Sequence, residues 1–117
     1  MPHKSDPSPL LPLTPAIAHI LLALADEDRH GYGIMQEVER LTAGAVRMGP
    51  GTLYGTLKRM LESGLVVETD DRPDPDMDDD RRRYYRATPL GLAALEAETA
   101  RMHALVSAAR SKRVRVR

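Results

Sequence analysis

The segment between Gly49 and Gly64 places the strongest constraint on how this chain folds. Gly49 suits the N-cap of a helix, and Pro50 suits the first helical position because its missing N–H would have no partner there in any case. Gly64 suits the position just beyond the helix end, where a left-handed backbone favours glycine. The sequence therefore predicts a helix with a defined start and a defined stop.

The two sides of this predicted helix differ in character. One side repeats apolar residues at the spacing of a helix packed on a core, with Leu53, Leu57, Met60 and Leu61. The other side is small, polar and basic, with Thr52, Gly55, Lys58 and Arg59. A helix N-terminus that carries glycines can approach a phosphate closely, and an outer face with Thr, Lys and Arg can enter a DNA major groove. The pattern therefore favours a helix that reads DNA.

Length and composition limit the alternatives. A chain of 117 residues predicts one domain, near the size at which a partner subunit often completes the core. The sequence contains no cysteine, which excludes disulfides and thiolate metal sites. No apolar run approaches the roughly 20 residues needed to cross a bilayer, and no export signal is recognisable. We therefore expect a cytoplasmic protein that forms a homodimer and has no contact with a membrane.

The charges of the chain are segregated. The 17 basic and 17 acidic residues give a net charge of zero, which on its own argues against a nucleic-acid partner. Seven aspartates lie between Asp70 and Asp80, however, four arginines follow between Arg81 and Arg86, and the last eight residues hold five basic residues and no acid. The zero net charge therefore does not exclude basic surfaces.

Cap and turn signals give the order of the predicted elements. Helices are predicted from Pro15 to the acidic run that begins at Asp26, over Gly31–Leu41, over the segment described above and over Leu90–Ser111. Two strands are predicted at Leu65–Thr69 and Arg82–Ala87, joined as a hairpin. This order predicts a mainly α fold with a small β-hairpin, which is a winged helix-turn-helix followed by a long C-terminal helix.

The predicted elements divide the chain into four parts. Residues 1–12 contain four prolines and are expected to form a flexible arm without regular structure. Residues 13–88 would form the winged helix-turn-helix domain, which binds DNA, and residues 89–111 a C-terminal dimerisation helix. Residues 112–117 would form a frayed basic tail.

The chain carries four segments in this order: Leu24 through Gly31-Tyr32-Gly33, then Gly51-Thr52-Leu53-Tyr54-Gly55-Thr56-Leu57-Lys58-Arg59-Met60, then Gly64-Leu65-Val66, then Arg83-Tyr84-Tyr85-Arg86-Ala87-Thr88-Pro89-Leu90-Gly91. Within them, Gly-Thr-Leu-Tyr and Tyr-Tyr-Arg-x-Thr-x-x-Gly in this order are specific. Over residues 13–110 the chain resembles the PadR family of transcriptional regulators, and its single C-terminal helix resembles the short subfamily. The resemblance implies that the first and last helices build a two-fold dimer and that the third helix reads operator DNA for a repressor. The acidic tip between the two strands departs from the family pattern, and we expect it to stay off the DNA.

The resemblance also implies roles for individual residues of the third helix. Gly51, Thr52 and Tyr54 would position the helix on the DNA backbone, and Lys58 and Arg59 would contact phosphates or base edges. For Tyr54 the alternative is a half-buried side chain that only extends its hydroxyl to water. Both interpretations of Tyr54 stay open at this stage.

Further contacts are expected outside the third helix. Arg81, Arg82 and Arg83 at the base of the wing would hold the flanking DNA backbone. Tyr32 is a weaker candidate, because it can instead pack on the third helix. The dimer contacts would come from the first and last helices, through Ile17, Leu21, Leu95, Met102, Leu105 and Val106. A small-molecule inducer would weaken DNA binding by favouring a dimer in which the two reading helices have the wrong spacing.

Other classes of function have weaker support. Asp74, Asp76 and Asp78 imitate the start of a calcium loop, but Asp79 stands where that loop needs glycine. The four histidines show no ligand spacing, and no catalytic constellation can be assembled, so we expect no metal, no cofactor and no enzyme activity. The alternative to a DNA-binding regulator is a winged-helix module that binds another protein, which zero net charge and an acidic wing would suit.

Overall fold

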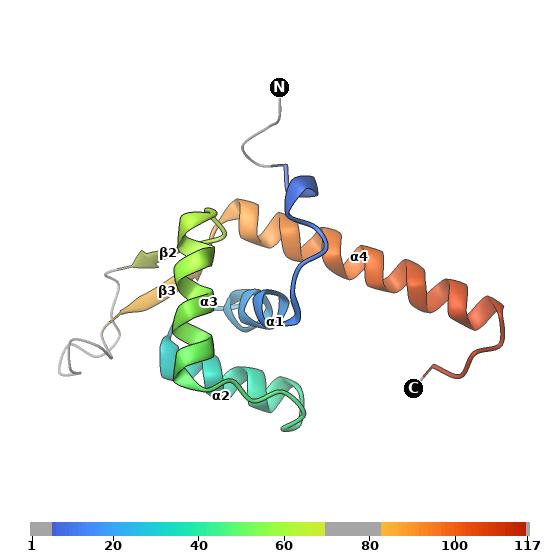
Figure 1. The fold of residues 1–117 in the computed structure, drawn as a ribbon, viewed down its shortest axis with the longest axis horizontal. Helices are drawn as coiled ribbons and strands as arrows, with labels where there is room; N and C mark the ends of the chain where they lie inside the picture. The colour runs from blue at the N-terminus through green and yellow to red at the C-terminus, as the bar shows by residue number, and fades with distance from the viewer. Residues whose placement is uncertain (1–5, 70–82, 117) are drawn as a thin grey trace.

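The computed structural model describes residues 6–69 and 83–116 (Figure 1). Its elements are, in order, the 3₁₀ helix η1 (Ser8–Leu10), α1 (Pro15–Leu24), β1 (Arg29–His30), α2 (Gly31–Leu41), α3 (Pro50–Glu62), β2 (Val66–Thr69), β3 (Tyr84–Ala87) and α4 (Pro89–Ser111). The mainly α fold with a small antiparallel sheet confirms the predicted fold class. Figure 1 shows α4 projecting away from the winged-helix part, on the side opposite to the wing.

Helix α1 is the centre of the core. It packs against α2, α3, α4 and β3, which explains why its sequence is apolar on nearly all sides. The fully buried side chains around it come from every one of the three first helices and from β2, and include Ile20, Leu21, Ile34, Val38, Leu53, Leu57, Met60 and Val66. The apolar side predicted for α3 therefore faces the core, although Leu61 is only partly buried.

The sheet has one more strand than the sequence predicted. Its order is β1-β3-β2, and both pairs are antiparallel. The hairpin of β2 and β3 is confirmed, with Val66 opposite Ala87 and Thr69 opposite Tyr84. Strand β1 was missed because two polar residues, Arg29 and His30, are too short a run to show the alternation by which strands are recognised.

The ends of α3 lie where the sequence placed them. Gly49 is the N-cap, Pro50 is the first helical residue and Gly64 has a φ of +77° beyond the last turn. The N–H of Leu65 donates to the carbonyl oxygen of Met60 at 2.9 Å, which closes the helix end. The chain passes from this closure straight into β2.

The start of α4 is joined to the end of α3 through Thr88. The Thr88 hydroxyl accepts from the N–H of Gly91 at 3.0 Å and donates to the carbonyl oxygen of Gly64 at 2.6 Å. Gly91 packs on the backbone of Leu65 so closely that a Cβ would overlap the Leu65 carbonyl oxygen. The first turn of α4 therefore needs glycine at this position.

The expectation that residues 1–12 lack regular structure is wrong for Ser8–Leu10. These residues form one 3₁₀ turn, which the fixed φ of proline favours at a helix start. Leu10 and Leu11 pack against the core, and the turn contacts α4. The apolar side chains between the prolines thus find a surface that the sequence could not reveal. Residues 1–5 lie outside the described part of the chain.

The expectation that the tail frays is wrong for its first residues. Arg113 has a φ of +64°, and the N–H of Val114 donates to the carbonyl oxygen of Ala109 at 3.0 Å. This closure caps α4 in the same way as Gly64 caps α3, here with a non-glycine residue in the left-handed conformation. Arg117 lies outside the described residues.

Candidate nucleic-acid interface

The outer face of α3 is exposed as predicted. Thr52, Gly55, Lys58 and Arg59 all lie at the surface. Arg59 reaches only the hydroxyl of Thr56, at 3.5 Å, and within residues 6–69 and 83–116 neither cation forms an ion pair. Two cations on one helix face thus have no counter-charge in the described part of the chain.

The N-terminus of α3 is open, in contrast to the other α-helices. Side chains cap the starts of α1, α2 and α4, through Thr14, His30 and Thr88 respectively. No side chain of the described residues caps α3, whose N-cap is Gly49. The N–H groups of its first turn can therefore donate to an external acceptor such as a phosphate.

The glycines of α3 are not required by packing among the described residues. A Cβ built on Gly49, Gly51 or Gly55 would have no heavy atom within 4 Å. Gly31 in α2 is different, since a Cβ there would overlap the ring and hydroxyl of Tyr54. Beyond the N-cap position of Gly49, no packing contact within the described residues requires these glycines, and the surface of α3 has no side chain at their positions.

Tyr54 shares its side chain between packing and surface. Its ring and hydroxyl lie over Gly31, which ties α3 to the start of α2, yet the residue is 43% exposed. Both roles considered for this residue, a partly packed ring and a contact to DNA, are sterically open in this arrangement.

His30 organises the start of α2 and was not recognised from the sequence. Its Nδ1 accepts from the N–H of Gly33 at 2.9 Å, so the ring caps the helix. Tyr32, which is 59% exposed, stacks on this ring, and Tyr84 contacts the ring edge-on. The available signal was the position of His30 directly before a predicted helix start, but histidine is not among the residues preferred at an N-cap.

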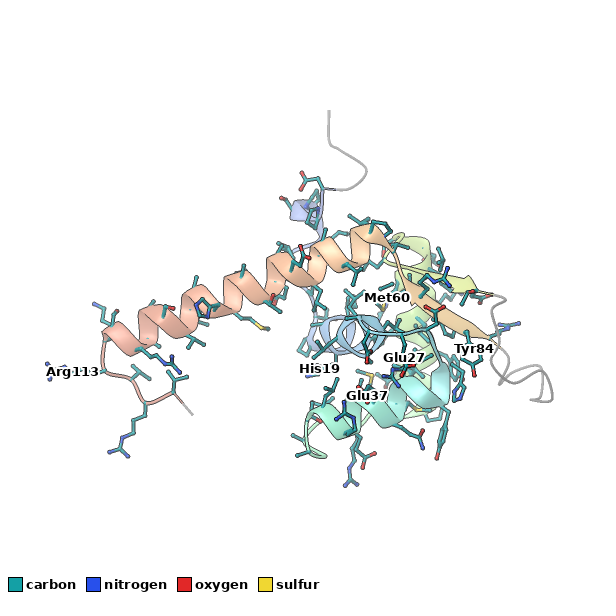
Figure 2. The ribbon with its side chains drawn as sticks, turned by 180° about the vertical axis from the view of Figure 1, so that it is seen from behind. His19, Glu27, Glu37, Met60, Tyr84 and Arg113 are labelled. Atoms are coloured by element: carbon teal, nitrogen blue, oxygen red, sulfur yellow. The ribbon has the colours of Figure 1, made fainter. Side chains whose placement is uncertain are left out.

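Several cations outside α3 are paired with acids. Arg29 reaches Glu27 at 3.0 Å and Glu37 at 3.5 Å, and Arg40 donates to both oxygens of Glu37 at 2.7 and 2.8 Å. Figure 2 shows Glu27 and Glu37 close together beside α2. The hydrogen bonds from Arg40 lower the pKa of Glu37, although burial opposes this effect.

The same pairing extends to the wing. Arg86 on β3 binds the carboxylate of Asp28 through two nitrogens, with a shortest distance of 2.8 Å. Arg83 at the wing base is exposed. Arg81, Arg82 and the acidic tip lie outside the described residues. Among the described positions, the sequence-predicted contacts on α3 share one face, and Tyr32 lies at the start of the neighbouring helix α2.

The predicted dimer residues fall into two groups. Met102 and Leu105, in the distal half of α4, are 46% and 67% exposed. Val106 is partly exposed, whereas Ile17 and Leu95 are partly covered by the core of their own chain. Leu21 is a correction, because it is fully buried inside the chain and has no surface to offer a partner. Its burial follows from the central place of α1.

The described residues show neither a metal-binding cluster nor a membrane-spanning helix. No three His, Asp or Glu side chains among the described residues gather to hold a metal ion. No helix among them is long and apolar enough to cross a membrane.

An open hollow of about 280 Å³ lies between the α1–β1 turn and α2, and its lining includes Glu27, Arg29, His30 and Gln36.

Comparison with known proteins places this geometry in context. Residues 20–97 match the family model described as the transcriptional regulator PadR-like family. The chain is 46% identical over 77 residues to transcriptional regulator Rv3488 of Mycobacterium tuberculosis, a match that spans 66% of this chain and 65% of the relative's length.

Solved structures show the same fold. A transcriptional regulator from Clostridium thermocellum superimposes with a TM-score of 0.67 at 24% identity, covering 86% of this chain and 90% of the other. A PadR family transcription regulator from Clostridium difficile superimposes with a TM-score of 0.66 at 23% identity, covering 82% of this chain and 95% of the other.

Proposed function

Because this chain belongs to the PadR-like family of transcriptional regulators and not to a family of enzymes, we propose that it binds double-stranded operator DNA through the outer face of α3. One observation carries the proposal: this face combines cations that form no ion pair within the described residues, glycines that no packing contact there requires, and a helix N-terminus whose N-cap is a glycine. All three features suit a close approach to a polyanion. Lys58 and Arg59 contact phosphates or base edges, while Gly51, Thr52 and Tyr54 position the helix on the backbone.

The wing and the start of α2 add contacts beside the groove. Arg83, with Arg81 and Arg82, holds the flanking DNA backbone. Tyr32 is available at the start of α2 because its ring lies on the surface. These contacts position the domain and do not by themselves select a sequence.

We also propose a homodimer that binds a pseudo-palindromic operator. The distal half of α4 exposes Met102 and Leu105, which the described part of the chain leaves uncovered. Burying such a side chain stabilises an interface by roughly 1.5–3 kcal/mol. Val106 lies at the same interface, and Ile17 and Leu95 lie at its margin. Two subunits related by a two-fold axis would present their α3 helices to successive major grooves.

The regulatory consequence is repression in the cytoplasm. A dimer seated on an operator excludes other proteins from that DNA. A small-molecule inducer lowers operator affinity by favouring a dimer with a different spacing of its α3 helices. Such a ligand acts only to the extent that it binds the two geometries with different affinity.

A salt titration of binding to random duplex DNA separates this proposal from a protein-interaction module. Phosphate contacts release counterions and give a steep slope. Lys58→Ala with Arg59→Ala is expected to reduce the slope by about one unit for each phosphate that the variant no longer neutralises. Arg110→Ala, which removes an exposed cation from α4, is the matched control. A shallow slope for the parent protein would contradict DNA binding, and an unchanged slope with unchanged affinity in the α3 double variant would remove Lys58 and Arg59 from the DNA interface.

The dimer is tested by sedimentation. Met102→Glu with Leu105→Glu places two charges where apolar side chains would meet, so the variant is expected to sediment as a folded monomer. Substituting Arg110 with Glu on the same helix controls for added negative charge. A dimer that survives the double substitution would place the interface elsewhere.

A further inference from the structure

Three residues of α4 are buried against the winged-helix domain, Gly91, Ala94 and Glu98, and the two at the ends of this contact define the direction of the helix. The first is Gly91, which rests on the backbone of Leu65. The second is Glu98, which is 1% exposed and is the last buried residue of the helix. The two positions are seven residues apart, about 10 Å along a helix axis. Two fixed points on a rigid rod define its direction.

The second attachment is a polar contact to a different element. Oε1 of Glu98 accepts from the backbone N–H of Leu13 at 3.3 Å and from Nε of Arg101 at 3.0 Å. Oε2 accepts from Nη2 of Arg101 at 2.7 Å. Leu13 is itself buried and directly precedes Thr14, the N-cap of α1. Glu98 therefore ties the middle of α4 to the start of the central helix of the core.

An acid is an unusual choice for this position if stability alone mattered. Burying a charge has a desolvation cost that a paired arginine only offsets, and an apolar residue of similar size is often as stabilising. An apolar contact, however, tolerates sliding and rotation, whereas a hydrogen bond to one backbone N–H fixes position and direction. The hydrogen bonds from Arg101 and from Leu13 also lower the pKa of Glu98, which keeps the carboxylate charged.

Beyond Glu98 the helix has no further attachment to the core among the described residues. None of the residues from Thr99 to Ser111 is buried, and Figure 2 shows the helix continuing away from the domain, with Arg113 just beyond its end. This free part is about 20 Å long, so that a tilt of about 10° moves its end by about 3 Å. The distal half carries Met102 and Leu105, the residues assigned above to the dimer interface.

We propose that Glu98 is a positioning residue that sets the direction in which the distal half of α4 leaves the winged-helix domain, and with it the spacing of the two α3 helices in the dimer. The spacing part rests on the proposed dimer through α4. The direction of α4 concerns a single chain and does not rest on the proposed dimer.

Distance measurements between spin labels test the direction. The chain has no cysteine, so Glu62→Cys at the end of α3 and Ser107→Cys in distal α4 provide two exposed labelling sites. Labelled chains are diluted in unlabelled protein so that only the distance within one chain is measured. Glu98→Leu fills the buried space without the hydrogen bond to Leu13, whereas Glu98→Gln keeps an oxygen that can accept it.

The expected result is a distance distribution that is shifted or broadened by about 3 Å or more in E98L and close to the parent in E98Q, with unchanged helix content in both. An E98L distribution that matches the parent would overturn the proposal. An E98Q distribution as altered as that of E98L would also overturn it, because the Leu13 contact would then not control the direction.

The consequence for the dimer is read separately, from Glu62→Cys alone, as the distance between the two α3 helices. That distance is expected to change in E98L and to hold in E98Q. A parent protein that sediments as a monomer would overturn the dimer and the spacing, while the distance within one chain still decides the direction of α4. A dimer with normal spacing in E98L would overturn only the role of Glu98 in setting the distance between the two α3 helices.

Discussion

The glycines of α3 and those of the interior present opposite situations. Gly31 and Gly91 stand where a Cβ would overlap a neighbouring group, so the fold itself explains them. Gly51 and Gly55 stand in open space, and nothing in the described chain explains their size. The contrast teaches that packing selects the small residues of the interior, whereas on α3 no packing contact among the described residues accounts for them. Substitution by alanine measures this contrast.

The largest effect is expected from Gly91→Ala. The added methyl would meet the backbone of Leu65, which cannot move aside as a side chain can, so the free energy of unfolding should fall by about 3 kcal/mol, the upper end for overpacking. Urea unfolding followed by circular dichroism measures the change. A loss below about 0.5 kcal/mol, typical of surface substitutions, would show that α4 has room to shift.

A smaller loss is expected from Gly31→Ala. Here the methyl meets the ring and hydroxyl of Tyr54, a partly exposed side chain that can turn away, so the free energy of unfolding should fall by about 1–2 kcal/mol. In a Tyr54→Ala background the same substitution should cost much less. Equal losses in both backgrounds would mean that Tyr54 is not the group that excludes a side chain from position 31.

For a glycine of α3, substitution by alanine should change the free energy of unfolding in the opposite direction. Gly55→Ala replaces glycine in an exposed helix interior, which should raise the free energy of unfolding by up to about 1 kcal/mol. The same variant should lose operator affinity by about tenfold, equivalent to about 1.4 kcal/mol, because the methyl occupies the approach of the DNA. Fluorescence anisotropy with a bound genomic fragment measures the affinity. A more stable variant with full affinity would leave this glycine without a function.

Lowering the pH should reduce the stability that the internal carboxylate of Glu98 contributes, whereas Lys58 and Arg59 on the α3 face should not add to this loss. The pKa of Glu98 is lowered from its ordinary value of 4.5 in the folded chain, so its stabilising effect is present above that value and is lost as the pH falls through the lower folded value. Glu98→Gln should therefore flatten the fall of the urea midpoint below about pH 4. Lys58→Ala with Arg59→Ala is the control and should leave the fall unchanged. An E98Q profile as steep as the parent's would assign the acid sensitivity to other carboxylates, among them Glu37, whose pKa is also lowered.

Where the sequence predicted the structure well, local signals were sufficient. The start and stop of α3 follow from Gly49, Pro50 and Gly64, whose backbone preferences act within one or two residues. The outward face of this helix follows from the spacing of its leucines. Both required only the periodicity and cap chemistry of a single segment.

The errors concern contacts between distant segments. Ser8–Leu10 form a turn against α4, and Leu21 is buried by elements that lie later in the chain. The hydrogen bond between Leu13 and Glu98 joins residues 85 positions apart, so no local pattern could indicate it. Of the candidate interface, the face of α3 could be predicted, whereas the cap by His30 and the pairing of Arg29 and Arg86 with acids depend on how the elements pack.

The packing of Tyr54 over Gly31 has a consequence for genetics. A selection for loss of the proposed repression should return substitutions at Gly31 beside those at Lys58 and Arg59, although Gly31 has no side chain with which to touch an operator. A residue at position 31 that is too large for Tyr54 to turn away from displaces α3 from beneath. The set of positions recovered by such a selection would then be wider than the footprint of the protein on its DNA.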